Sequence, residues 1–96
     1  MRVIVDGTLI GSQADLHRTL AGPLDFGPYY EHNLNALWDR LSKDVDRPVE
    51  IVWENAGASR DRMGDEAFEE IASVLLRAAE EDEPYPPDLR LTVRFT

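Results

Sequence analysis

The chain has 96 residues, of which 43% are hydrophobic, and this is enough for one folded domain with a single core. It contains no cysteine, which excludes a disulfide framework and a thiolate zinc site. Nineteen acidic residues against ten basic ones give a formal charge of −9, which disfavours nucleic-acid binding and favours either simple solubility or a cationic protein partner.

The chain begins with the β-branched run Val3-Ile4-Val5, and the turn-forming pair Asp6-Gly7 follows it. This pattern predicts a first, short strand. The run is too short for a secretory signal, and no apolar stretch of the chain approaches the roughly 18–20 residues of a membrane span. We therefore expect a cytoplasmic protein that contacts no membrane.

A helix is predicted next, because Ser12 and Asp15 resemble a capping box with a shortened acid at its fourth position. The helix should run through Leu16 and Leu20. Gly22-Pro23 should end it, since proline cannot continue a helix and glycine favours its end.

The next segment is a loop from Pro23 to about His32, which carries the pair Tyr29-Tyr30. Asn33 can cap a second helix. The apolar positions of this helix recur at i, i+3, i+4 and i+7 and form one buried stripe: Leu34, Leu37, Trp38 and Leu41. We expect Trp38 to be at least half buried and one tyrosine of the pair to lie in the core.

The opposite side of this helix carries Asn35 and Asp39, four residues apart on the solvent face. Beside two aromatic rings, such a polar face suits recognition, because tyrosines are enriched where proteins bind tightly. The alternative is structural: Lys43 lies at i+4 from Asp39, so the two can form a solvated helix pair of little energetic consequence.

The remaining elements follow in order. Arg47-Pro48 ends the second helical region, residues 49–53 read as a strand, and residues 55–59 suggest a loop or a single helical turn. A long helix is predicted from residue 65 to about 82, followed by prolines and by an alternating strand that contains Leu89, Leu91, Val93 and Phe95. The order β-α-α-β-(short α)-α-β predicts one α/β domain over residues 1–96, with a three-stranded parallel sheet packed with helices.

Catalytic chemistry is poorly supported. His17 and His32 lie on different predicted elements outside any acid–base motif, and His17 in mid-helix reads as a surface residue. The serines lack a nucleophile-elbow context, and Asp61 with Asp65 is a weak metal signal without further spaced ligands. We therefore expect no enzyme, no cofactor and no metal site.

One segment matches a known family. The pattern Tyr29-Tyr30-x-x-Asn33-Leu34-x-Ala36-Leu37-Trp38-Asp39-x-Leu41 resembles the signature of barstar, the intracellular inhibitor of the secreted ribonuclease barnase. The resemblance covers essentially the full length, through four further segments: Asp6-Gly7, Asp15-Leu16-His17-x-Thr19-Leu20, Val49-x-Ile51-x-Trp53 and Val74-Leu75-x-Arg77-Ala78. It implies a three-stranded parallel sheet packed with helices.

The resemblance also implies a function: blocking the active site of a cationic, secreted, guanyl-specific ribonuclease. Asp39 would take the place of an RNA phosphate among the enzyme's cations, and Tyr29 would pack near its catalytic histidine. The free protein is expected to be a monomer. The partner-binding positions implied are Tyr29, Tyr30, Glu31, Asn33, Leu34, Asn35, Trp38, Asp39, Asp44 and Asp82.

Several of these positions depart from the family pattern. Asn35 stands where the family has an acid, Glu31 replaces a glycine and Asp44 replaces a tryptophan, while two acidic contact positions align with Ala78 and Asp82. These departures favour a related ribonuclease with a differently arranged rim over barnase itself. The alternative is an acidic interaction or antitoxin-like module of the same fold with a partner that is not a ribonuclease.

Overall fold

The sheet has three parallel strands, as the sequence predicted, and the structure shows their spatial order to be β1-β2-β3. The computed structural model describes all residues 1–96, and its strands are β1 (Arg2–Asp6), β2 (Val49–Glu54) and β3 (Leu91–Phe95). In the register Val3 lies opposite Ile51, and Ile51 opposite Val93. The central strand is therefore the second in the sequence, and because all three strands are parallel the chain must cross over the sheet twice.

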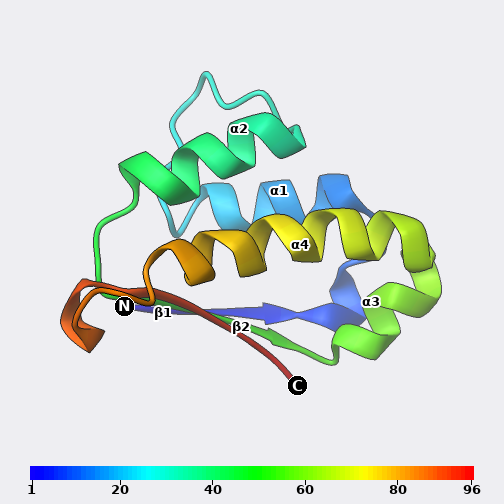
Figure 1. Cartoon of the computed structure of the whole chain (residues 1–96). Helices are drawn as coiled ribbons and strands as arrows, with labels where there is room; N and C mark the ends of the chain where they lie inside the picture. Colours follow the sequence, from blue (N-terminus) through cyan, green and yellow to red (C-terminus); the bar gives the residue numbers. More distant parts are fainter.

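Four helices connect the strands: α1 (Gln13–Ala21), α2 (Leu34–Asp39), α3 (Ala56–Met63) and α4 (Asp65–Glu81). A π-helical segment, Arg40–Asp44, continues α2, and 3₁₀ turns form at Gly7–Leu9 and Pro87–Leu89. Figure 1 shows α1 and α4 on one face of the sheet, with α2 beyond them and α3 beside the carboxyl ends of the strands. None of the helices combines the length and the apolar content needed to cross a membrane.

The core lies between the sheet and this helical layer. Its fully buried side chains come from every layer of the fold, and the largest are Trp53, Leu16, Leu20, Leu37, Leu41, Ile51, Ile71, Leu75 and Leu91. The alternation of buried and exposed residues in β1 follows the strand period, so Val3 and Val5 face the helices. The single apolar stripe of α2 packs into this core and attaches the outer helix to the domain.

The predicted helix caps are confirmed. The Oγ of Ser12 accepts a hydrogen bond from the Asp15 amide at 3.1 Å, and Asp15 in turn accepts from the Gly11 amide at 2.9 Å. The shorter side chain of Asp15 therefore reaches the residue before the N-cap. The Oδ1 of Asn33 accepts from the amide of Ala36 at 2.8 Å and so fixes the start of α2.

Two boundaries differ from the sequence prediction. Residues 55–59 were expected to form a loop or a single turn. Most of them belong instead to the eight-residue helix α3, which a tertiary contact of Ser59 holds in place. The hydroxyl of Ser59 is buried, accepts from the indole of Trp53 at 3.0 Å and donates to the carbonyl of Gly7 at 2.8 Å. Leu89 lies in a 3₁₀ turn, because the prolines delay the start of β3 to Leu91.

Candidate functional site

The loop before α2 sends its two tyrosines in opposite directions. Tyr29 is 87% exposed, whereas Tyr30 is only 7% exposed and belongs to the core. This confirms that one ring of the pair is buried. The buried ring of Tyr30 can support a contact surface but offers little area of its own, and its direct contact with a partner stays a prediction.

Tyr30 is held by an aromatic cluster beneath the loop. Its hydroxyl lies 2.5 Å from the Nδ1 of His17, and its ring packs against Phe26 and His32 at centroid distances of 4.7 and 5.0 Å. Burial raises the pKa of Tyr30 to about 12, against a smaller opposing effect of Arg40, so the phenol keeps its proton and can donate to His17. The loop that carries Tyr29 is thereby fixed to α1.

His17 was expected on the surface, and this expectation is wrong. Its side chain is only 2% exposed, and burial lowers the pKa of its imidazole, with the neighbouring His32 as a second cause. Sequence reasoning missed the burial although a signal was present, since His17 lies three residues before Leu20 and thus on the apolar side of α1.

A polar groove of about 480 Å³ lies between this loop and the outer face of α2. It brings together seven of the ten predicted partner-binding residues, and its full lining is Tyr29, Tyr30, Glu31, Asn33, Asn35, Ala36, Asp39, Arg40, Lys43 and Asp44. The three predicted residues outside it are Leu34, Trp38 and Asp82. Arg40 was not among the predicted residues, because the sequence does not show which face of the helix is turned toward the loop.

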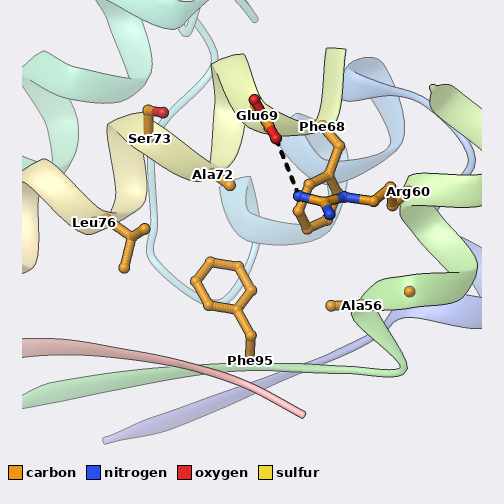
Figure 2. A pocket seen from close by; sticks show the side chains of 9 residues that line it. Ala56, Arg60, Phe68, Glu69, Ala72, Ser73, Leu76 and Phe95 are labelled. Carbon is orange, nitrogen blue, oxygen red and sulfur yellow. Dashed lines mark hydrogen bonds and ion pairs between the residues drawn. The ribbon is translucent and has the colours of Figure 1, made fainter. Parts of the chain in front are cut away.

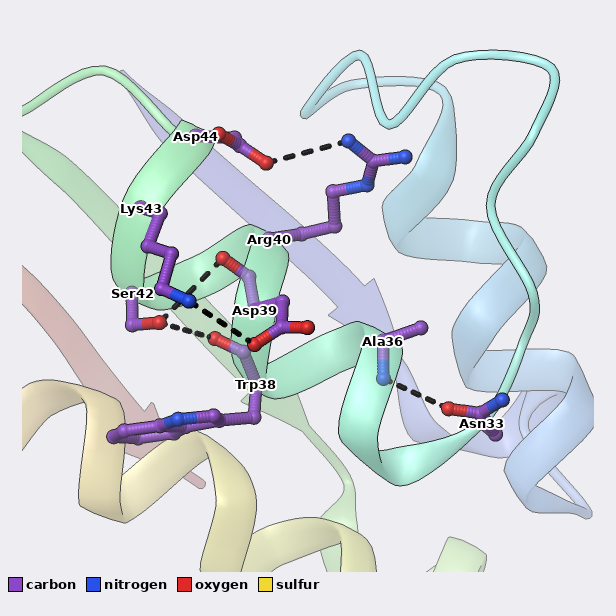
Figure 3. A network of polar contacts seen from close by, with 8 residues as sticks. All are labelled: Asn33, Ala36, Trp38, Asp39, Arg40, Ser42, Lys43 and Asp44. Carbon is purple, nitrogen blue, oxygen red and sulfur yellow. Dashed lines mark hydrogen bonds and ion pairs between the residues drawn. The ribbon is translucent and has the colours of Figure 1, made fainter.

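Two ion pairs run side by side along the groove, each linking residues four apart (Figure 3). Lys43 Nζ lies 3.5 Å from Asp39 Oδ1, and Arg40 donates from Nη1 to Asp44 Oδ2 at 3.3 Å. The helix pair of Asp39 and Lys43 is therefore formed as the structural alternative predicted. Because the Asp39 side chain is 60% exposed and that of Lys43 is 70% exposed, the pair is weak and leaves the carboxylate accessible.

Leu34 and Trp38 support α2 from its buried side. Leu34 packs against the core, and the half-buried indole of Trp38 lies beneath the guanidinium of Arg77, 4.8 Å from the ring centroid. The hydroxyl of Ser42 donates to the carbonyl of Trp38 at 2.7 Å. These contacts fix the helix, and Trp38 is at least half buried, as expected. A direct role of either residue in binding stays a prediction.

Asp82 differs most from its expected place at a partner contact, because it is 7% exposed and its carboxylate is engaged inside the protein. Its Oδ2 accepts from Arg47 Nε at 2.9 Å and from the amide of Leu91 at 2.6 Å. Arg47 also donates to the carbonyls of Leu41 and Val45. This buried ion pair joins the end of the α2 region to α4 and β3, and no local pattern signals a contact between residues 35 positions apart.

Comparison with known proteins places these features in a family. The family model described as "Barstar (barnase inhibitor)" matches residues 1–94. The chain belongs to the barstar family. It is also 38% identical over 80 residues to "Putative ribonuclease inhibitor YrdF" of Bacillus subtilis (strain 168), an alignment that covers 83% of this chain and 87% of the relative.

Membership of the barstar family supports a ribonuclease-inhibitor role, with a ribonuclease as protein partner. The polar groove of this barstar-family chain is built from the segment in which the resemblance was found. No group of three or more His, Cys, Asp or Glu side chains is arranged to hold a metal ion. Asp61 and Asp65 in particular fall on separate helices, on either side of Gly64.

A second hollow of about 450 Å³ lies elsewhere on this barstar-family domain, between α3, α4 and the end of β3 (Figure 2). It is mainly apolar, with Phe68, Leu76 and Phe95 in its lining. Arg60 and Glu69 pair across its rim at 3.4 Å. None of the predicted partner-binding residues lines it.

Proposed function

We propose that the chain inhibits a secreted, guanyl-specific ribonuclease of the barnase type by covering its active site with α2 and the preceding loop. In this proposal the carboxylate of Asp39 takes the place of an RNA phosphate. The observation that carries it is the joint exposure of Asp39 and Tyr29 on the two sides of one groove in a barstar-family fold.

The chemistry of Asp39 fits a phosphate pocket. A ribonuclease must hold a phosphodiester with cations, and a carboxylate accepts charge-assisted hydrogen bonds from arginine, lysine or protonated histidine as a phosphate oxygen does. The exposed ring of Tyr29 adds a flat surface that can stack on an imidazole of the enzyme. Asn33, which caps α2, and the anchored Tyr30 hold both groups in place before binding, which reduces the entropy lost on association.

The acidic surplus of the chain fits the same partner. A formal charge of −9 attracts a cationic enzyme over distances up to about the Debye length, roughly 8 Å at physiological ionic strength. We propose that association occurs inside the producing cell between this protein as a monomer and the enzyme. The association rate should then decrease as salt is added.

The direct test is inhibition of RNA cleavage by purified guanyl-specific ribonucleases, with barnase among them. Central anchors of an interface contribute about 2 kcal/mol or more, so Asp39→Ala should weaken inhibition at least roughly 30-fold. Asp61→Ala removes the same charge from an exposed position on α3 and serves as the matched control, with inhibition expected to stay within about threefold. Equal inhibition by the wild type and Asp39→Ala would refute phosphate mimicry by Asp39.

The second candidate function is an acidic interaction or antitoxin-like module with a partner that is not a ribonuclease. Asn35 favours it, because this exposed groove position carries no charge where the family pattern has an acid. Co-purification from the native host distinguishes the two. A stable partner without RNA-cleaving activity, together with no inhibition of any guanyl-specific ribonuclease, would favour the module.

A further inference from the structure

The polar groove is nearly balanced in charge, although the whole chain is strongly acidic. It is lined by three acids, Glu31, Asp39 and Asp44, and by two bases, Arg40 and Lys43. The formal charge of the chain is −9, so most of the acidic surplus lies outside the groove. The groove therefore presents acids and bases together, in the pairs Asp39–Lys43 and Arg40–Asp44, whereas the surrounding surface supplies the long-range attraction.

Both bases retain hydrogen-bond donors that no protein group uses. The ammonium of Lys43 has three donors and a single partner, Asp39 Oδ1 at 3.5 Å. Arg40 uses only Nη1, toward Asp44. The side chain of Lys43 is 70% exposed and that of Arg40 is 31% exposed, so Lys43 is the more accessible cation.

A partner with cations alone would fit this groove poorly. When Asp39 exchanges Lys43 for cations of the enzyme, the ammonium of Lys43 is left beside those same cations. Like charges placed together in an interface cost several kcal/mol, and an acceptor on the partner that faces Lys43 removes this cost. Figure 3 shows Lys43 reaching back over the helix toward Asp39, whereas Arg40 extends to the other side toward Asp44.

We infer that the partner enzyme carries a carboxylate next to the cations that receive Asp39, and that Lys43 pairs with this carboxylate in the complex. The inference rests on the proposed function. In the complex Asp39 would pair with the cations of the enzyme, and Lys43 would pair with the neighbouring carboxylate of the enzyme. Lys43 is then a specificity residue, because it rejects an enzyme whose phosphate pocket lacks a neighbouring acid.

The sign of one substitution separates this arrangement from simple competition. If Lys43 only competes for Asp39, Lys43→Gln frees the carboxylate and tightens binding. If Lys43 pairs with the enzyme, Lys43→Gln leaves a carboxylate of the enzyme unpaired and weakens binding. The pair of Lys43 and Asp39 in the free protein is exposed and weak, so its loss should be the smaller effect.

The experiment measures association and dissociation rates of the full chain with two probes: barnase and the guanyl-specific ribonuclease purified from the medium of the host by its activity. We expect Lys43→Gln to accelerate dissociation about tenfold from at least one of the two. Arg94→Gln makes the same charge change on the exposed side of β3 and should leave dissociation within about twofold. Dissociation of Lys43→Gln at the wild-type rate, or slower, from both enzymes would overturn the inference.

The proposed function and this inference fail in different ways. If the wild type binds neither enzyme, both are wrong; if Asp39→Ala weakens binding while Lys43→Gln does not, only the inference is wrong.

A double-mutant cycle identifies the partner group. Each exposed Asp and Glu of the enzyme that binds is replaced by the corresponding amide and measured against wild type and Lys43→Gln. One carboxylate should show an effect that disappears in the Lys43→Gln background. Additive effects at every position would show that no carboxylate pairs with Lys43.

Discussion

Replacing Asp82 with alanine tests whether the acidic end of α4 belongs to the fold or to a partner contact. The Asp82 side chain is 10% exposed and that of Arg47 is 15% exposed, so both charges lie largely out of water. The substitution leaves the guanidinium of Arg47 without a counter-ion and the amide of Leu91 without its acceptor. Arg47 keeps its bonds to the carbonyls of Leu41 and Val45.

Removal of one partner from a buried ion pair costs roughly 3–5 kcal/mol of the free energy of unfolding. The residual exposure of Arg47 and its two carbonyl partners place Asp82→Ala near the lower end, at about 3 kcal/mol. For a domain of this size each kcal/mol lowers the melting temperature by about 4–8 °C, so the expected decrease is roughly 12–24 °C.

The assay is urea unfolding followed by far-UV circular dichroism, with ribonuclease binding measured at a temperature where the variant is folded. Glu81→Ala removes the same charge from the exposed neighbouring position and should change the free energy of unfolding by less than about 0.5 kcal/mol. Wild-type stability of Asp82→Ala, together with binding weakened tenfold or more, would refute the structural role and restore Asp82 as a contact residue.

Three further predictions concern buried polar groups. Tyr30→Phe should lower the free energy of unfolding by about 1–3 kcal/mol, because Nδ1 of the buried His17 loses its partner. Burial lowers the pKa of His17 below its ordinary 6.5, so the unfolded chain takes up the proton first as the pH falls. The free energy of unfolding, measured with urea, should therefore be constant above about pH 7.5 and decrease as the pH falls through 6.5. His17→Gln should flatten this slope. Ser59→Ala should cost about 1–3 kcal/mol by the same assay, because the indole N–H of Trp53 and the carbonyl of Gly7 both lose their partner, and a loss below about 0.5 kcal/mol would show that water replaces the hydroxyl.

The features that sequence predicted well depend on groups close together in the chain. Ser12 and Asp15 are three residues apart, and Asn33 caps an amide three residues further on, so each cap is decided by local geometry. The end of α1 before Gly22-Pro23 follows from the backbone limits of those two residues. The parallel sheet follows from helical crossovers between β-rich segments.

The features that sequence missed depend on distant partners. Asp82 is buried because Arg47 and Leu91 approach it from other elements, and a cluster of acids at the end of a helix gives no sign of this. The length of α3 depends on Ser59, whose hydroxyl bridges Trp53 and Gly7. In both places a tertiary hydrogen bond outweighs the local preference, which is weak for short segments.

The candidate site divides in the same way. Its members come from one continuous segment, residues 29–44, so the resemblance alone indicates most of them. Their orientation could not be read in that way, because it depends on which tyrosine turns inward to meet His17 on α1. The resulting surface exposes Tyr29 and Asp39 and keeps Arg40 and Lys43 beside them, so its charge pattern differs from that of an acidic surface.

This division separates the two ways in which a substitution can change binding. Tyr30 anchors the loop and Asp82 anchors the far end of the α2 region, so substitution of either should lower the stability of the fold. It should also weaken the affinity for every partner by a similar factor, because the surface is less often in its binding conformation. Asp39 and Lys43 are exposed and contribute little to stability, so their substitution should change the preference among partners at nearly constant stability. Stability and affinity measured on the same variants therefore distinguish the residues that hold the surface from those that select the enzyme.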